Sequence, residues 1–240
     1  MRADILHAQA CIDWAVGKFP AIQREIDAWI GENIYVEVRD EPVPSAHAIV
    51  VACEKQSLPL WFNVEIGAHI NAIRSSLDLL ATALLSRNRV SKNAEAHFPI
   101  YRSQQDFIDP VDGLEGIKWL SKAEKSIIKP LEPYEGGNAL LWSLHQSDIL
   151  RKHRRLLEVA VQPGTFRVSG FGVSPITPVW RRENDETIIA KIAKGAACDK
   201  LSVTTFIAIN EPFVERMPVL NTLMRYASLA QDIIALFDAP

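Results

Sequence analysis

The residues best suited to chemistry are charged side chains that lie beside an apolar stripe on an expected helix, residues 63–87. Arg74 and Asp78 are four residues apart, so they face the same side of this helix, and Asn71 lies on the same arc. The stripe itself consists of Ile66, Ile70, Ile73, Leu77, Leu80 and Leu84. We expect the charged arc to lie at an interface, where charges need partners. The alternative is that Arg74 and Asp78 pair along an amphipathic helix as a solvated or half-buried ion pair. Such pairs contribute about 0–1 kcal/mol when they are exposed.

A second charged helix is expected at residues 138–157. Leucines define its inward side, and Asp148, Lys152 and Arg155 continue that side further along the helix. Its last part, residues 151–155, reads RKHRR and has the charge needed to bind phosphate or an RNA backbone. The alternative is a helix C-terminus whose positive charge complements the helix dipole. A helical run spreads these side chains around the axis, so they cannot all face one ligand.

The matching charged faces suggest that the two helices face each other. Asp78 would then meet Lys152 or Arg155, and Arg74 would meet Asp148. Charges at such an interface must be paired or hydrogen-bonded, because an unpaired buried charge is costly. The sequence therefore predicts a polar patch between the two helices.

Two histidines on the second helix have more than one interpretation. His153 falls beside the charged stripe, nearer Trp142 and Ile149, and is either a solvated residue or a general acid or base. His145 and Asp148 are three residues apart and have the spacing to share a metal. Because the chain has no HExxH motif and no clustered Cys and His residues, we expect neither a metal nor a cofactor.

Composition and charge exclude several classes of protein. The chain has 240 residues and a formal net charge of −3, which provides no overall electrostatic footprint for nucleic acid, although a local basic patch is still compatible with it. Its three cysteines lack close spacing, and no apolar run has the length of a membrane span. We expect a cytoplasmic protein without a membrane partner.

The expected fold is α+β, with a helical core and a mostly antiparallel sheet from the second half. Further helices are predicted at residues 4–29, with an end or a kink at Pro20, and at 113–120, 121–129 and 218–237; Ser121 and Glu124 form a capping-box pattern. Strands are predicted at residues 34–39, 48–53, 157–162, 165–173, 187–193 and 201–210, with a turn at Pro163-Gly164. The first two strands are expected to form a hairpin that could join the edge of the sheet. We expect one domain over residues 1–240, with a helical core at about 1–157, a sheet-rich part at about 157–210 and a C-terminal helix at 217–238.

Three segments resemble a loose group of uncharacterised bacterial and phage proteins. The segments read INAIRSSLDLLATALL, HFPI and DILRKHRRLL, and members of the group show an LRSALDHLA helix, an FPI segment and an IDKHR helix. The matching residues are Arg74, Ser75, Leu77, Asp78, Leu80, Ala81, Phe98, Pro99, Ile100, Lys152, His153 and Arg154. Arg151 stands where the group has Asp, so one carboxylate is missing. The resemblance covers roughly residues 60–160 and implies no known activity.

Three functions fit these observations. The first is an accessory protein, bacterial or phage, that binds a small anionic ligand or a protein partner through the polar patch. The second is a nuclease or nucleotide-acting hydrolase that uses Arg74 and Lys152 on phosphate and His153 or Asp78 for proton transfer. The third is a homo-oligomer in which the charges form a buried ion-pair network. Solvent access to Arg74 and Asp78 would favour the first two, and a sealed network would favour the third.

Overall fold

The structure is a computed structural model that describes residues 2–40, 46–89, 96–170, 173–174, 179–183, 186–194 and 198–238. The chain divides into two compact units. The first, here called the helical unit, comprises Met1–Pro20, Trp61–Glu158 and Asn210–Pro240, and the second, the sheet unit, comprises Ala21–Leu60 and Val159–Ile209. The sequence predicted one α+β domain; the α+β class is confirmed, and its helices and strands separate largely into these two units.

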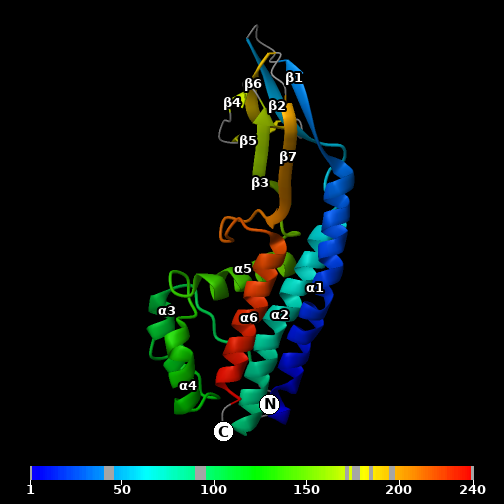
Figure 1. The fold of residues 1–240 in the computed structure, drawn as a ribbon. Coiled ribbons are helices and arrows are strands. Elements are labelled where there is room, and N and C mark those ends of the chain that lie inside the picture. The colour runs from blue at the N-terminus through cyan, green and yellow to red at the C-terminus, as the bar shows by residue number, and fades with distance from the viewer. Residues whose placement is uncertain are drawn as a thin grey trace. The chain divides into compact units, whose positions relative to one another are not determined.

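Four of the described helices have at least 15 residues (Figure 1). They are α1 (Leu6–Asn33), α2 (Leu60–Arg87), α5 (Ala139–His153) and α6 (Val219–Leu236). Helix α1 continues through Pro20, where the sequence predicted an end or a kink. None of the described helices combines the length and the apolar character that crossing a membrane would require.

Burial follows the predicted apolar stripe of α2. Its six stripe residues, from Ile66 to Leu84, are each at most 1% exposed, which confirms the expected core face. On α6, Leu223, Tyr226 and Ile233 are buried in the same way, and the Tyr226 hydroxyl donates to the Ser143 hydroxyl of α5 over 3.0 Å. Apolar burial of this kind is the main favourable term in folding, and it holds α2 and α6 in place within the helical unit.

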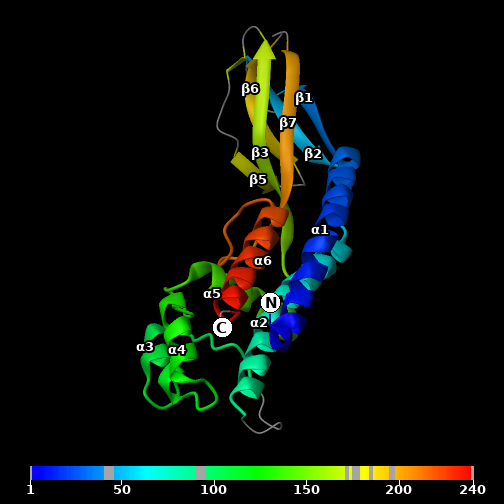
Figure 2. The same cartoon turned by 60° about the horizontal axis from the view of Figure 1, so that its bottom comes forward.

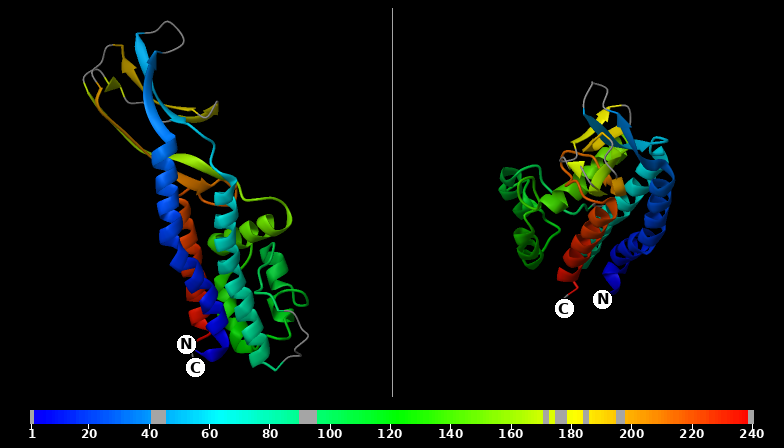
Figure 3. Two further views of the ribbon diagram at one scale, coloured as in Figure 1. Left: turned by 90° about the vertical axis from the view of Figure 1, so that its right-hand side faces the viewer. Right: turned by 45° about the horizontal axis from the view of Figure 1, so that its top comes forward.

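The ends of the described chain meet at one end of the helical unit (Figures 1 and 3). The backbone N–H of Arg2 donates to Asp238 over 2.6 Å. Arg87, at the C-terminal end of α2, donates to Asp4 over 2.9 Å and to the carbonyl of Phe237 over 3.3 Å. Helices α2 and α6 therefore end where the chain begins, so both run antiparallel to the first part of α1.

A connection with short helices links α2 to α5. It contains α3 (Gln104–Ile108), a 3-10 turn η2 (Leu114–Gly116), α4 (Lys122–Ile128) and a second turn η3 (Lys129–Leu131). The predicted capping box of α4 is confirmed, because Ser121 and Glu124 bond each other's backbone N–H groups. The helix predicted at residues 113–120 is reduced to η2.

The described strands of the sheet unit form two antiparallel sheets. Figure 2 shows strands of both. The larger contains β1 (Ile34–Asp40), β2 (His47–Glu54), β4 (Val173–Ser174), β5 (Val179–Glu183) and β6 (Glu186–Ala193). The smaller pairs β3 (Val159–Gly170) with β7 (Cys198–Ile209). The predicted N-terminal hairpin does join strands of the second half, because β2 pairs with β6.

One turn that the sequence predicted between two strands lies inside a single strand. The sequence placed a turn at Pro163-Gly164, whereas β3 runs through both residues and shifts its register between Pro163 and Phe166. Proline is tolerated at such an irregularity because its missing N–H costs no ladder hydrogen bond there. The Thr204 hydroxyl of β7 accepts from the Thr165 N–H over 2.7 Å, which stabilises the bulge.

Candidate functional site

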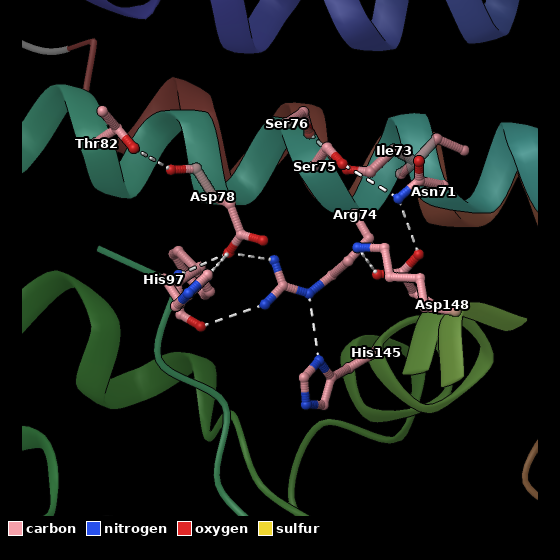
Figure 4. Close-up of polar contacts among 12 residues, drawn as sticks. Asn71, Ile73, Arg74, Ser75, Ser76, Asp78, Thr82, His97, His145 and Asp148 are labelled. Atoms are coloured by element: carbon pink, nitrogen blue, oxygen red, sulfur yellow. Dashed lines mark hydrogen bonds and ion pairs between the residues drawn. The ribbon is translucent and has the colours of Figure 1, made fainter. Parts of the chain in front are cut away.

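Arg74 is the centre of the site, and its guanidinium is held on three sides (Figure 4). Its Nη1 donates to Asp78 Oδ1 over 2.7 Å, its Nε to His145 Nδ1 over 3.3 Å and its Nη2 to the Phe98 carbonyl over 3.5 Å. Arg74 is only 4% exposed. Its charge is therefore paired within the protein, and the side chain fixes the positions of its three neighbours.

Asp78 connects α2 to the FPI segment. Its Oδ1 accepts from the backbone N–H of Phe98 over 2.9 Å, and His97 Nδ1 lies 3.7 Å from the same oxygen. The Asp78 side chain is 27% exposed. No described residue donates a hydrogen bond to its second oxygen, Oδ2, which leaves a carboxylate oxygen able to accept one from a ligand.

His145 is held as a neutral imidazole. Its Nδ1 accepts from Arg74, so the ring proton resides on Nε2. Burial, with the charge of Arg74 adding to it, lowers the pKa of His145 to about 4. The carboxylates of Asp148 and Asp78 raise the pKa of His145 and only partly offset this effect. His145 therefore acts near neutral pH as a fixed hydrogen-bonding group.

Asp148 and Lys152 form the second ion pair of the site. Lys152 Nζ lies 2.6 Å from Asp148 Oδ2, and Asn71 Nδ2 donates to Asp148 Oδ1 over 3.1 Å. Asp148 is 4% exposed, whereas the Lys152 side chain is 36% exposed. The buried carboxylate thus holds an ammonium group that solvent can reach.

The predicted facing of the two helices is confirmed, but the ion pairs predicted between them are wrong. The bonds between α2 and α5 run from Arg74 to His145 and from Asn71 to Asp148. Each cation instead pairs with a carboxylate four residues away on its own helix. This spacing brings opposite charges together without help from another element, so the local pairs satisfy both cations.

Arg155 lies outside this cluster, contrary to the prediction. It makes a two-pronged ion pair with Glu211, with N–O distances of 2.8 and 2.9 Å, and Glu211 also accepts from the Glu158 N–H. Helix α5 ends at His153, so Arg155 no longer follows the helical period on which the prediction depended. Its role is to anchor the chain near Glu211.

The charged cluster opens into a cleft of about 490 Å³ within the helical unit. Its walls come from α2, α5 and residues 97–119. The predicted residues that line it are Arg74, Asp78, His145, Asp148, Lys152 and His153. Four further residues line it, namely His97, Tyr101, Asp112 and Trp119. Sequence reasoning did not assign the last three to the site, and it did not place His97 beside Asp78. The available signal was the position of His97 directly before the FPI segment.

The cleft combines paired charges with exposed imidazoles. Arg74 balances Asp78 and Lys152 balances Asp148, while Asp112 stands exposed at the wall. The His97 side chain is 73% exposed, and His153 is exposed as well. An imidazole ring carries at least one N–H group that can donate to an anion. Lys152, His97 and His153 are therefore the groups available to an anion from solvent.

Comparisons of the sequence and the structure with protein-family models, curated proteins and solved structures find no match. Among the described residues, no group of three or more His, Cys, Asp or Glu side chains is arranged to hold a metal ion. Inferences about function therefore depend on the geometry of the cleft.

Proposed function

We propose that the protein binds a small ligand with an anionic group in the cleft between α2, α5 and residues 97–119. The observation that carries this proposal is the Lys152 ammonium, which buried Asp148 fixes at 2.6 Å while solvent still reaches it. An ammonium group held in this way loses little conformational entropy when it contacts a phosphate or carboxylate. His153, its neighbour on α5, and His97 add donors at the same cleft.

Solvent access favours ligand binding over a purely structural network. Arg74 is almost completely buried at the base of the cleft, but Asp78 and Lys152 are partly exposed to solvent there. A network that served only to fix helix register would need no open cleft beside it. In the proposal, buried Arg74 holds Asp78 and buried Asp148 holds Lys152 in position before a ligand arrives.

Calorimetric titration with inorganic phosphate tests the proposal. The matched variants are Lys152→Gln and Arg154→Gln, which each remove one positive charge from exposed positions two residues apart. Glutamine at position 152 can still donate to Asp148. We expect Lys152→Gln to weaken phosphate binding about tenfold or more, as loss of a charged hydrogen bond does, and Arg154→Gln to change it little. Absence of binding, or equal weakening by both variants, would reject the proposal.

A second candidate function is cleavage of a phosphodiester, favoured by His97 next to Asp78. Asp78 is itself fixed by Arg74 and by the Phe98 N–H, so it is placed to orient the imidazole of His97. His97 and His153 would then transfer protons, while Lys152 would contact the phosphate. A loss of RNA or DNA cleavage in His97→Ala and in His153→Ala that is much larger than the loss of phosphate binding in the same variant would support this function. Intact oligonucleotides after incubation with the wild-type protein would exclude it.

A further inference from the structure

The cleft has an apolar character besides its ionisable groups. Partly exposed apolar and aromatic side chains line it, namely Ile100, Tyr101, Ile117, Trp119 and Ile149. A simple inorganic anion would leave these surfaces in contact with water. Ligand sites in proteins typically combine such apolar walls with a few placed polar groups, in volumes of roughly 300–1,000 Å³. The cleft, at about 490 Å³, has both properties.

Its aromatic residues are fixed in position by the surrounding chain. The Tyr101 N–H donates to the Pro133 carbonyl over 2.8 Å, and its ring packs edge-on against Phe107 with centroids 5.6 Å apart. Burial raises the pKa of Tyr101 to about 12, so its phenol remains neutral. The Trp119 carbonyl accepts from Asn88 Nδ2 over 3.0 Å, which holds the backbone that carries the indole ring. Aromatic side chains have few rotatable bonds, so they can stack on a flat ring without a large entropic cost.

We propose that the natural ligand is a nucleotide, that is, a phosphate joined through a sugar to a flat base. The phosphate would contact Lys152 and His153, and the base would stack on Trp119. Asp78 Oδ2, to which no described residue donates a hydrogen bond, would accept one from a sugar hydroxyl or from an amino group of the base. This inference depends on the proposed anion-binding function and names its ligand class.

The test compares three kinds of ligand that all contain a phosphate group. Inorganic phosphate, ribose 5-phosphate and a set of nucleoside monophosphates are titrated into the full-length protein by calorimetry. Stacking of one base on an aromatic side chain is expected to make the best nucleoside monophosphate bind at least about tenfold more tightly than ribose 5-phosphate. Trp119→Leu should remove this gain and leave the affinity for ribose 5-phosphate unchanged. Trp61→Leu, which changes an exposed tryptophan outside the cleft, is the matched control.

The outcomes separate this inference from the proposed function. If phosphate binds but every nucleoside monophosphate binds no more tightly than ribose 5-phosphate, the nucleotide inference is wrong and anion binding stands. If no phosphate compound binds, both proposals fall. A gain that survives in Trp119→Leu but disappears in Trp61→Leu would place the base outside this cleft and would also overturn the inference.

Discussion

At the scale of single residues, His145 makes the stability of the protein depend on pH. Its pKa is about 4 in the folded protein and 6.5 in the reference state. Between these values the unfolded chain takes up a proton that the folded protein does not. The contribution to stability is therefore complete above about pH 6.5, declines as the pH falls and reaches its minimum below about pH 4. From the pKa difference, the loss is at most about 3 kcal/mol.

Replacement of His145 by glutamine should flatten this dependence. Glutamine keeps an acceptor for Arg74 Nε but does not titrate. The free energy of unfolding of the His145→Gln variant should therefore fall less between pH 6.5 and 4 than that of the wild type. Urea denaturation at several pH values measures both curves. Parallel curves over this interval would show that His145 has the same pKa in both states.

The success and failure of sequence reasoning at this scale have the same origin. Helical periodicity assigned Asp148 and Lys152 to one face correctly, because a regular helix fixes the direction of each side chain. It did not predict the pairing of Arg74 with Asp78 in preference to Asp148, since periodicity describes one helix and not the distances between two. His97 was not placed beside Asp78, because the irregular segment that carries it has no period from which the direction of a side chain follows.

At the scale of elements, Gly67 sets how closely the side chain of α5 approaches α2. A Cβ at Gly67 would overlap Cδ of Arg151, whereas a Cβ at Gly17 in α1 would have no neighbour within 4 Å. Alanine is the better helix former by up to about 1 kcal/mol. Gly17→Ala should therefore stabilise the protein, while Gly67→Ala should destabilise it by about 1–3 kcal/mol through overpacking.

Thermal and urea denaturation of both variants measure the difference. The double variant Gly67→Ala/Arg151→Ala removes the clashing side chain, so it should be more stable than the sum of the two single changes predicts. Stabilisation by Gly67→Ala alone would mean that Arg151 moves aside without cost. Additive effects in the double variant would show that the two positions do not interact.

Element boundaries show where local sequence signals lose to tertiary context. Ser121 and Glu124 were identified from sequence because a capping box is satisfied entirely by local contacts. Pro163 and Gly164 were misassigned as a turn because the partner strand, with Thr204 filling the bulge, lies about forty residues away in sequence. Contacts of that range leave no mark in the local pattern.

At the scale of the whole molecule, the division into two units follows from pairings that skip over long stretches of chain. Strand β2 pairs with β6, so Ala21–Leu60 joins Val159–Ile209 across the whole segment that builds the cleft. The sequence predicted the α+β class and that the hairpin joins later strands. It did not show two units, because strand patterns reveal which face is apolar but not which distant partner covers it.

The cleft lies wholly within the helical unit, which predicts how a ligand changes the dynamics of the protein. A phosphate ligand at about 100 times its dissociation constant stabilises the state that binds it by about 2.7 kcal/mol. If the units unfold independently, this should slow hydrogen exchange in α2 and α5 by up to about a hundredfold and leave β2, β6 and β7 unchanged. Exchange measured by mass spectrometry with and without ligand resolves these segments. Lys152→Gln should remove the slowing. Equal slowing in helices and strands would instead show that the two units unfold as one, since stabilisation of the helical unit would then be shared by every amide whose exchange requires global unfolding.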